Sequence, residues 1–175
     1  MTNSALLIID MQNGLFSIEN YPIHDGESLT KNILSLISKA REAHVPIFFI
    51  QHNESKGKRL ETGSKNWEIY PKLNPKENDI NIQKNHMDSF LETNLDEELK
   101  TRKITHLIIT GLSTPQCIDT TVRSAISHDY EVTLIEDAHS TIDSEVLSAS
   151  QIIAHHNDVL QFFADIKREE DFVFN

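Results

Sequence analysis

The sequence contains only one cysteine and five glycines among its 175 residues. A single cysteine cannot form a disulfide within the chain, and this is typical of proteins from a reducing compartment. With so few glycines, the sequence has neither a G-x-G-x-x-G pattern nor a Walker-type lysine loop. These absences disfavour a disulfide scaffold and a nucleotide-binding domain.

Long apolar runs and clusters of basic residues are also missing. The apolar stretch near the N-terminus spans only residues 5–9, and no basic segment precedes it. Such a stretch is too short for a signal peptide or a membrane span, so we predict a cytoplasmic protein with no membrane partner. The net charge is −11 and the basic segment at residues 56–59 is short, which disfavours nucleic acid as a partner.

Patterns of buried strands alternate with patterns of amphipathic helices along the chain. Apolar runs predict strands at residues 5–10, 45–50, 79–84, 106–112 and 131–137, and helical spacing predicts helices at residues 28–43, 91–102, 115–130 and 145–164. Residues 171–174 could form a sixth strand or an ordered tail. Strands that alternate with helices imply right-handed crossovers, so we predict one α/β domain over residues 1–175, with a parallel sheet covered on both faces.

A long polar stretch with little periodicity lies between the second and third predicted strands, at residues 53–78. We predict a loop with short helical turns there. Loops of this length in compact domains are often part of a functional site. We therefore expect this loop to determine much of the ligand specificity.

Cys117 lies between the predicted strand that ends near Gly111 and the predicted helix at residues 115–130. Thr114 is the expected N-cap of this helix, and Pro115 suits its first position. The thiol would then lie in the first helical turn, where free N–H groups and the helix dipole favour the thiolate. Cys117 is therefore a candidate nucleophile, and the alternative is a small apolar side chain in the core.

Asp10 and Lys84 also lie at the carboxyl ends of predicted strands, the edge where α/β sheets bind their ligands. A nucleophilic cysteine needs a base and hydrogen-bond donors for an oxyanion. Asp10 could accept the thiol proton, and Lys84 could lower the pKa of Cys117. The alternatives are that Asp10 caps a turn and that Lys84 is solvated.

At these residues the chain resembles the isochorismatase-like cysteine hydrolases, which include nicotinamidases and N-carbamoylsarcosine amidase. The matching segments are LLIIDMQN at 6–13, WEIYPKL at 67–73, Lys84 followed by DSF at 88–90, GLSTPQCIDTTVRSA at 111–125, and residues 132–138. The resemblance covers nearly the whole chain. It implies a three-layer α/β/α fold around a six-stranded, mainly parallel sheet, assembled as a homodimer or a higher homo-oligomer.

The resemblance also implies a catalytic triad of Asp10, Lys84 and Cys117. In this family the cysteine attacks a carbonyl, the lysine stabilises the thiolate and the aspartate relays protons, through a thioester that water hydrolyses. A non-proline cis peptide bond would join Leu112 to Ser113, and the N–H groups of Ser113 and Cys117 would form the oxyanion hole. The implied activity is hydrolysis of a C–N bond of amide, lactam or carbamoyl type in a small molecule, without a cofactor.

The sequence departs from the nicotinamidases, which hold a metal with an Asp-x-His pair and a further histidine. Gln51 stands where that aspartate is expected, so His52 and His86 would make a poor metal site. We predict no metal site and keep nicotinamidase only as an alternative function. Family members that cleave the vinyl ether of isochorismate lack the cysteine, so Cys117 favours amide chemistry.

Phe16, Trp67 and Gln12 are the candidate pocket residues. Aromatic walls from Phe16 and Trp67 could stack on a planar amide, and Gln12 could orient the Asp10 carboxylate or cap a turn. The sequence is also similar to a metal-poor branch of the family that includes a streptothricin lactam hydrolase, in which His-His-Asn recurs in the last helix. We interpret this triplet, at residues 155–157, as structural because adjacent helical residues cannot both face one site.

A different class of function is a non-catalytic module whose thiol responds to oxidation. The chain has no second cysteine, so a reversible disulfide would need glutathione or another subunit. Asp10 and Lys84 favour the hydrolase, because a redox sensor needs a thiolate but no carboxylate for proton relay.

Overall fold

Six parallel strands form one sheet in the computed structural model, which describes residues 3–17 and 22–174. The strands are β1 (Ser4–Ile9), β2 (Ile47–His52), β3 (Ile80–Lys84), β4 (His106–Leu112), β5 (Glu131–Ser140) and β6 (Asp165–Lys167). Their order is β3-β2-β1-β4-β5-β6, so the chain builds outward from β1 in one direction and then from β4 in the other. The strand order therefore reverses between β1 and β4, where open α/β sheets bind their ligands.

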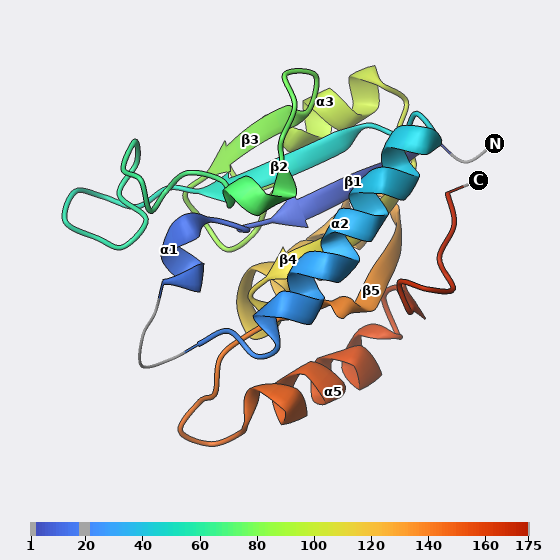
Figure 1. Cartoon of the computed structure of the whole chain (residues 1–175). Helices are drawn as coiled ribbons and strands as arrows, with labels where there is room; N and C mark the ends of the chain where they lie inside the picture. The colour runs from blue at the N-terminus through green and yellow to red at the C-terminus, as the bar shows by residue number, and fades with distance from the viewer. Residues whose placement is uncertain (1–2, 18–21, 175) are drawn as a thin grey trace.

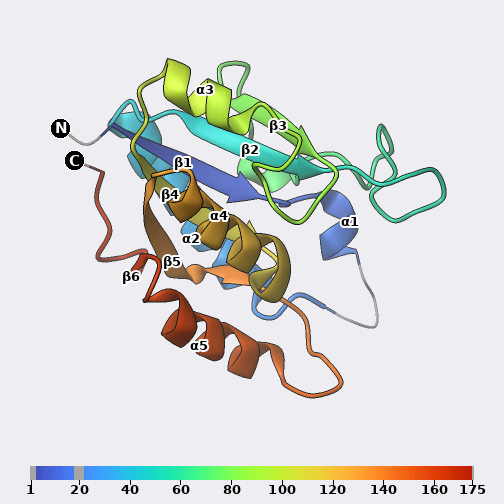
Figure 2. The same cartoon turned by 180° about the vertical axis from the view of Figure 1, so that it is seen from behind.

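Helices cover both faces of the sheet (Figures 1 and 2). The helix α2 (Gly26–Glu42) lies on one face, and α3 (Leu95–Thr101), α4 (Asp119–Ser127) and α5 (Ala149–Leu160) pack on the other. The short helices α1 (Asn13–Phe16) and η1 (Pro71–Leu73) lie in connections. The predicted three-layer α/β/α architecture with a six-stranded parallel sheet is confirmed.

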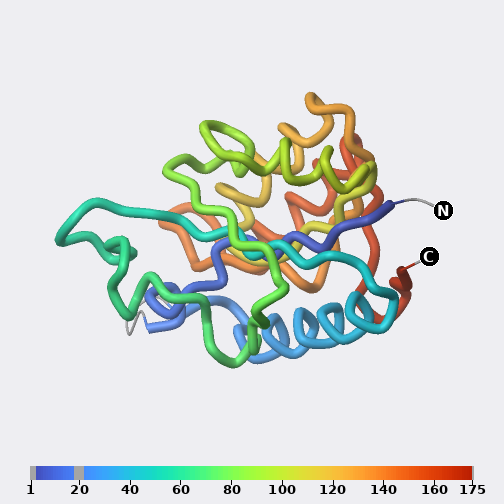
Figure 3. The backbone as a smooth tube through the Cα atoms, turned by 90° about the horizontal axis from the view of Figure 1, so that it is seen from above, coloured from blue at the N-terminus to red at the C-terminus, as the bar shows by residue number. Residues whose placement is uncertain are grey.

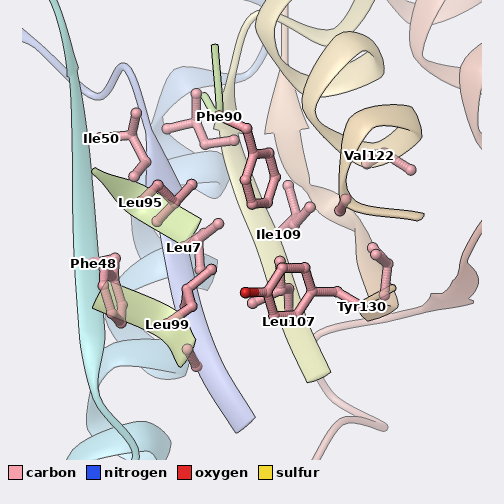
Figure 4. Packing of buried hydrophobic residues seen from close by; sticks show 14 of the residues in the cluster. Leu7, Phe48, Ile50, Phe90, Leu95, Leu99, Leu107, Ile109, Val122 and Tyr130 are labelled. Carbon is pink, nitrogen blue, oxygen red and sulfur yellow. The ribbon is translucent and has the colours of Figure 1, made fainter. Parts of the chain in front are cut away.

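Alternate side chains of β1 pack into two separate cores, one on each face of the sheet. Leu7 lies in the core beneath α3 and α4, together with Leu99 and Val122 (Figure 4). Its neighbour Leu6 points to the other face and packs in the core beneath α2. Every residue of β1 is buried, as expected for a central strand of a parallel sheet.

The C-terminal part of the chain differs from the prediction. The helix α5 is shorter than the predicted range of 145–164, because Ser148 and Gln151 form a capping box that starts it at Ala149. The sixth strand is β6, which the sequence pattern did not indicate because three residues carry no periodicity. Residues 171–174 form an ordered tail, and its Phe172 packs in the core beneath α2.

The start of the predicted cysteine helix also differs. A π-helical turn, η2 (Thr114–Ile118), precedes α4, and Ser113 rather than Thr114 is the N-cap residue. Thr114 does not cap the helix because its hydroxyl group forms a hydrogen bond with His139 Nδ1 at 2.8 Å. Cys117 therefore lies inside a π turn, a feature that is frequent at functional sites.

The long segment between β2 and β3 extends beyond the sheet (Figure 3). Its only helix is η1, so the predicted loop with short helical turns is confirmed. Among the helices of the described residues, none combines the length and the apolar character that a membrane crossing requires.

Gly111 in β4 leaves no room for a side chain beside β1. It pairs with Ile9 and has a φ of +114°, and a Cβ atom there would lie 2.1 Å from the carbonyl oxygen of Ile9. Only glycine fits this position without moving the backbone of β1.

We predict that Gly111→Ala lowers the free energy of unfolding by more than about 3 kcal/mol, because a central strand must shift. Gly63→Ala is the matched control: Gly63 has a φ of +83° but open space around it. The control should lose only about 1 kcal/mol. Urea denaturation of both variants measures the losses, and equal losses would contradict the assignment of a steric role to Gly111.

Candidate active site

The carboxyl ends of β3, β2, β1 and β4 bring the predicted triad together. Asp10 directly follows β1, Lys84 is the last residue of β3, and Cys117 lies in the η2 turn after β4. His52, the last residue of β2, lies between them in the strand order. The side chains of four neighbouring strand ends thus meet beside the point where the strand order reverses.

The Lys84 ammonium group is the centre of this cluster. Its side chain is fully buried, and Nζ donates to Asp10 Oδ2 at 2.9 Å and to the carbonyl oxygen of His86 at 3.0 Å. Two further contacts, each at 3.2 Å, join Nζ to Cys117 Sγ and to His52 Nδ1. The ammonium group therefore fixes the carboxylate and the sulfur relative to each other.

The Asp10 carboxylate is buried, and only one of its two oxygens has a hydrogen-bond partner in the described part of the chain. Oδ2 accepts from Lys84, whereas Oδ1 is buried and meets no N–H or O–H donor in the described part of the chain. The backbone of Asp10 has a φ of 51°, a left-handed conformation that aspartate tolerates better than most residues. One oxygen of Asp10 is thus free to accept a proton at the site.

The Cys117 thiol is 5% exposed and lies 3.4 Å from Met87 Sδ. Burial raises the pKa of the Cys117 thiol to about 12; the nearby Asp10 carboxylate adds to this rise, and the Lys84 ammonium group opposes it. Lys84 lowers the pKa of the Cys117 thiol, as predicted. The prediction that this pKa is depressed overall is wrong, because desolvation raises it by more than Lys84 lowers it. The resting protein therefore holds a neutral thiol.

A cavity of about 130 Å³ opens beside Cys117. Its walls consist of Asp10, Leu15, His52, Glu54, Leu60, Met87, Ser113, Gln116 and Cys117. Both residues expected to provide oxyanion-binding N–H groups, Ser113 and Cys117, thus face this space, and the peptide bond from Leu112 to Ser113 is cis. The cavity suits a small molecule that presents a carbonyl to the sulfur.

The three predicted pocket residues do not line this cavity. Gln12 is fully buried and binds the backbone of His52 and the carbonyl of Trp67, so it joins β2 to the long loop. Phe16 stacks on Tyr70 with ring centroids 4.1 Å apart, and the Trp67 indole N–H donates to Asn53 at 2.8 Å. Each of these side chains thus contacts another part of the protein outside the cavity wall, and their contact with a ligand stays a prediction.

The residues considered for a metal site have other roles. Gln51 donates to the carbonyl of Trp67 and accepts from Asn81, so both ends of its amide have structural partners. His52 lines the cavity, whereas the His86 ring is outside it and pairs with Glu92. Within residues 3–17 and 22–174, no three His, Cys, Asp or Glu side chains are grouped as a metal site requires.

Burial and Lys84 lower the pKa of His52, and Asp10 and Glu54 oppose that shift. The His52 ring is therefore neutral near pH 7. A neutral imidazole can accept a hydrogen bond from the Lys84 ammonium group through Nδ1, which fits their contact.

A hydrogen-bonded chain that the sequence analysis missed supports the nucleophile turn. His139 is buried at the end of β5, and its Nε2 bonds to Asn157 Oδ1 at 2.8 Å. Because Asn157 donates from Nδ2 to the Glu136 carbonyl, its Oδ1 accepts from His139, and His139 Nδ1 is left to accept from the Thr114 hydroxyl. The predicted structural role of the 155–157 triplet is thus carried by Asn157. The signal for His139 was a histidine at a strand's carboxyl end.

A larger hollow of about 640 Å³ lies between α2, β5 and α5, and His139 and Asn157 are part of its wall. Neither Asp10 nor Cys117 borders it. The reactive groups therefore belong to the smaller cavity.

Burial lowers the pKa of His139 to about 4, from 6.5 in an exposed histidine. A depressed histidine pKa stabilises the fold above pH 6.5, and this stability is lost as the pH falls towards 4, because the unfolded chain binds the proton more tightly. We predict that the free energy of unfolding falls by about 3 kcal/mol more over this range in the native protein than in His139→Gln. Urea denaturation at several pH values measures the difference. The contributions of His52 and His106 to the pH dependence are the same in both proteins and cancel. Parallel pH curves would contradict a buried neutral His139.

Comparison with known proteins places this geometry in a family. The model of the isochorismatase domain matches residues 4–157. The secreted isochorismatase effector Isc1 of Verticillium dahliae is 34% identical over 152 residues, which cover 86% of this chain and 80% of Isc1. The ureidoacrylate amidohydrolase RutB of Variovorax paradoxus is 26% identical, over 98% of this chain and 81% of RutB.

The fold gives the same result. A crystal structure described as an isochorismatase family protein superimposes with a TM-score of 0.90 at 33% sequence identity, and covers 95% of this chain and 98% of that one. The chain belongs to the isochorismatase family of hydrolases.

Proposed function

We propose that the chain is a cysteine hydrolase that cleaves an amide-type C–N bond of a small molecule through a thioester at Cys117. The observation that carries this proposal is the buried contact of the Lys84 ammonium group with both Asp10 and Cys117 at the wall of a cavity. A structural cysteine has no need of a buried ion pair, whose desolvation is costly.

The neutral thiol and the free Asp10 oxygen together define the first step. The substrate carbonyl enters the cavity, the Cys117 proton moves to Asp10 Oδ1, and the sulfur bonds to the carbonyl carbon. Proton transfer within the site avoids the need for a free thiolate, which burial disfavours. Lys84 stabilises the charge on the sulfur as the proton leaves.

The remaining steps return the site to its starting state. The tetrahedral oxyanion accepts hydrogen bonds from the N–H groups of Ser113 and Cys117, and the C–N bond breaks as protonated Asp10 gives its proton to the leaving nitrogen. Water then attacks the thioester while Asp10 takes a proton from it. When the C–S bond breaks, that proton returns to Cys117, and the net reaction adds one water to yield an acid and an amine.

The structure weakens the two alternative functions. A redox-responsive thiol should be accessible and acidic, whereas Cys117 is buried and its pKa is raised. A nicotinamidase of the metal-holding type needs a carboxylate at position 51, and there the Gln51 amide is bound on both sides. The name of the relative RutB, a ureidoacrylate amidohydrolase, is consistent with C–N chemistry. A cytoplasmic location and assembly as a homo-oligomer stay predictions.

The direct test replaces each proton-transferring residue and measures turnover of small amides. We predict that Cys117→Ala and Asp10→Asn each lower kcat by at least about 10³-fold, because each removes a bond-forming or proton-carrying group. Ser144→Ala, in the loop before α5, is the control and should keep native turnover. Native turnover in Cys117→Ala, with the fold intact by circular dichroism, would contradict the proposal.

The pKa of the thiol gives a second test, which needs no substrate. Because the Asp10 carboxylate raises the pKa of Cys117, Asp10→Asn should lower that pKa and shift the pH profile of iodoacetamide alkylation to lower pH. The same variant should thus alkylate faster at pH 8 while it loses turnover. Alkylation at pH 8 that is slower than in the native protein would contradict the proposed coupling of Asp10 to Cys117.

A further inference from the structure

One charged side chain in the wall of the cavity beside Cys117 has no ion-pair partner among the described residues. The Asp10 carboxylate is paired with Lys84, the Cys117 thiol is neutral, and His52 is neutral near pH 7. The remaining charged wall residue is Glu54, which forms no ion pair within the described residues. The wall therefore has an excess of one negative charge.

The Glu54 carboxylate is held in place by its own loop. Oε2 accepts from the backbone N–H of Leu60 at 2.6 Å, and the backbone N–H of Glu54 donates to the Leu60 carbonyl at 3.0 Å. The Thr62 N–H donates to the Glu54 carbonyl at 3.2 Å. The other carboxylate oxygen, Oε1, has no hydrogen-bond partner among the described residues and is available to a ligand.

The surroundings of Glu54 strengthen its effect on a ligand. Leu15, Leu60 and Met87 supply apolar walls, so the space between the carboxylate and the sulfur is poorly hydrated when a ligand fills it. Charge interactions are stronger in such an environment than in water. An anionic group there would be repelled by Glu54, whereas a neutral group would gain no charge interaction with it.

We propose that Glu54 selects substrates that carry a positively charged nitrogen group at the end of the acyl chain away from the scissile amide. This inference rests on the proposed function, because it identifies the substrate class of the same site. The amide carbonyl lies at Cys117, a short apolar chain lies against Leu15 and Met87, and the ammonium or amidinium group binds Glu54. The cavity volume of about 130 Å³ limits the connecting chain to a few carbons.

A pair of isosteric amides tests the selectivity. 4-Aminobutanamide carries an ammonium group where pentanamide has a methyl group. We predict that the native protein favours the cationic amide at least about ten-fold in kcat/KM, mainly through KM, and that Glu54→Gln removes most of this preference. Glutamine keeps an oxygen for the Leu60 N–H, so the variant removes the charge and leaves the loop bond possible.

Glu61→Gln is the matched control. Glu61 lies in the same loop and accepts from the Gly57 N–H at 2.8 Å, but it does not line the cavity. We predict that this variant keeps the native preference for the cationic amide. Equal loss of selectivity in both variants would overturn the assignment to Glu54.

Charged thiol reagents test the same charge without hydrolysis. Cys117 is the only cysteine, so the modification rate of the protein reports on this site alone. We compare 2-aminoethyl methanethiosulfonate, a cation, with 2-sulfonatoethyl methanethiosulfonate, an anion, and normalise the rate ratio to that of a small free thiol. The ratio of cation to anion should fall about ten-fold in Glu54→Gln and stay native in Glu61→Gln.

The two measurements separate the inference from the proposed function. A reagent ratio that falls in Glu54→Gln, with no amide hydrolysed by the native protein, would support the cation site and contradict the hydrolase. Hydrolysis of both amides at equal kcat/KM, with the same reagent ratio in the native protein and Glu54→Gln, would overturn the inference and leave the hydrolase in place.

Discussion

The buried ammonium group of Lys84 is the interaction on which the geometry of the site depends. A buried cation is tolerated only when its partners replace water with good geometry. Here those partners come from separate strand ends: Asp10 after β1, His52 at the end of β2, and Cys117 after β4. The site can form only if four parallel strands end at the same level, and Gly111 allows β4 to lie close enough to β1.

The burial of this cluster also determines the protonation state of the Cys117 thiol. Desolvation raises the pKa of the Cys117 thiol, so the native protein holds little thiolate near pH 7. In the mechanism that we propose, the proton of the thiol moves to a neighbouring base, the buried Asp10 oxygen that has no hydrogen-bond partner in the described part of the chain. Because Asp10 is paired with Lys84 and the thiol carries no charge, we propose that the Glu54 carboxylate is the main charge that a substrate meets in the cavity. The two proposals thus assign catalysis to Asp10 and selectivity to Glu54.

The sequence predicted the parts of the molecule that follow from periodicity and from strand ends. Apolar runs located five strands, and the topology of a parallel sheet then brought Asp10, Lys84 and Cys117 together. The contacts of side chains in irregular segments could not be predicted from the sequence. Gln12 binds backbone groups of a loop, and Thr114 bonds to a histidine from β5 instead of capping its helix. Such partners are far apart in the sequence, and no local pattern encodes them.

In the proposed mechanism the acyl group is transferred to Cys117 before water attacks, and its partitioning between water and a second nucleophile can be measured. We choose two substrates that share the 4-aminobutanoyl group, one of which releases ammonia and the other methylamine. Each is hydrolysed in the presence of hydroxylamine. Both substrates form the same thioester. The ratio in which this thioester reacts with water and with hydroxylamine cannot depend on which amine has left. We therefore predict the same ratio of hydroxamate to acid from both substrates. A ratio that depends on the leaving amine would contradict the thioester at Cys117.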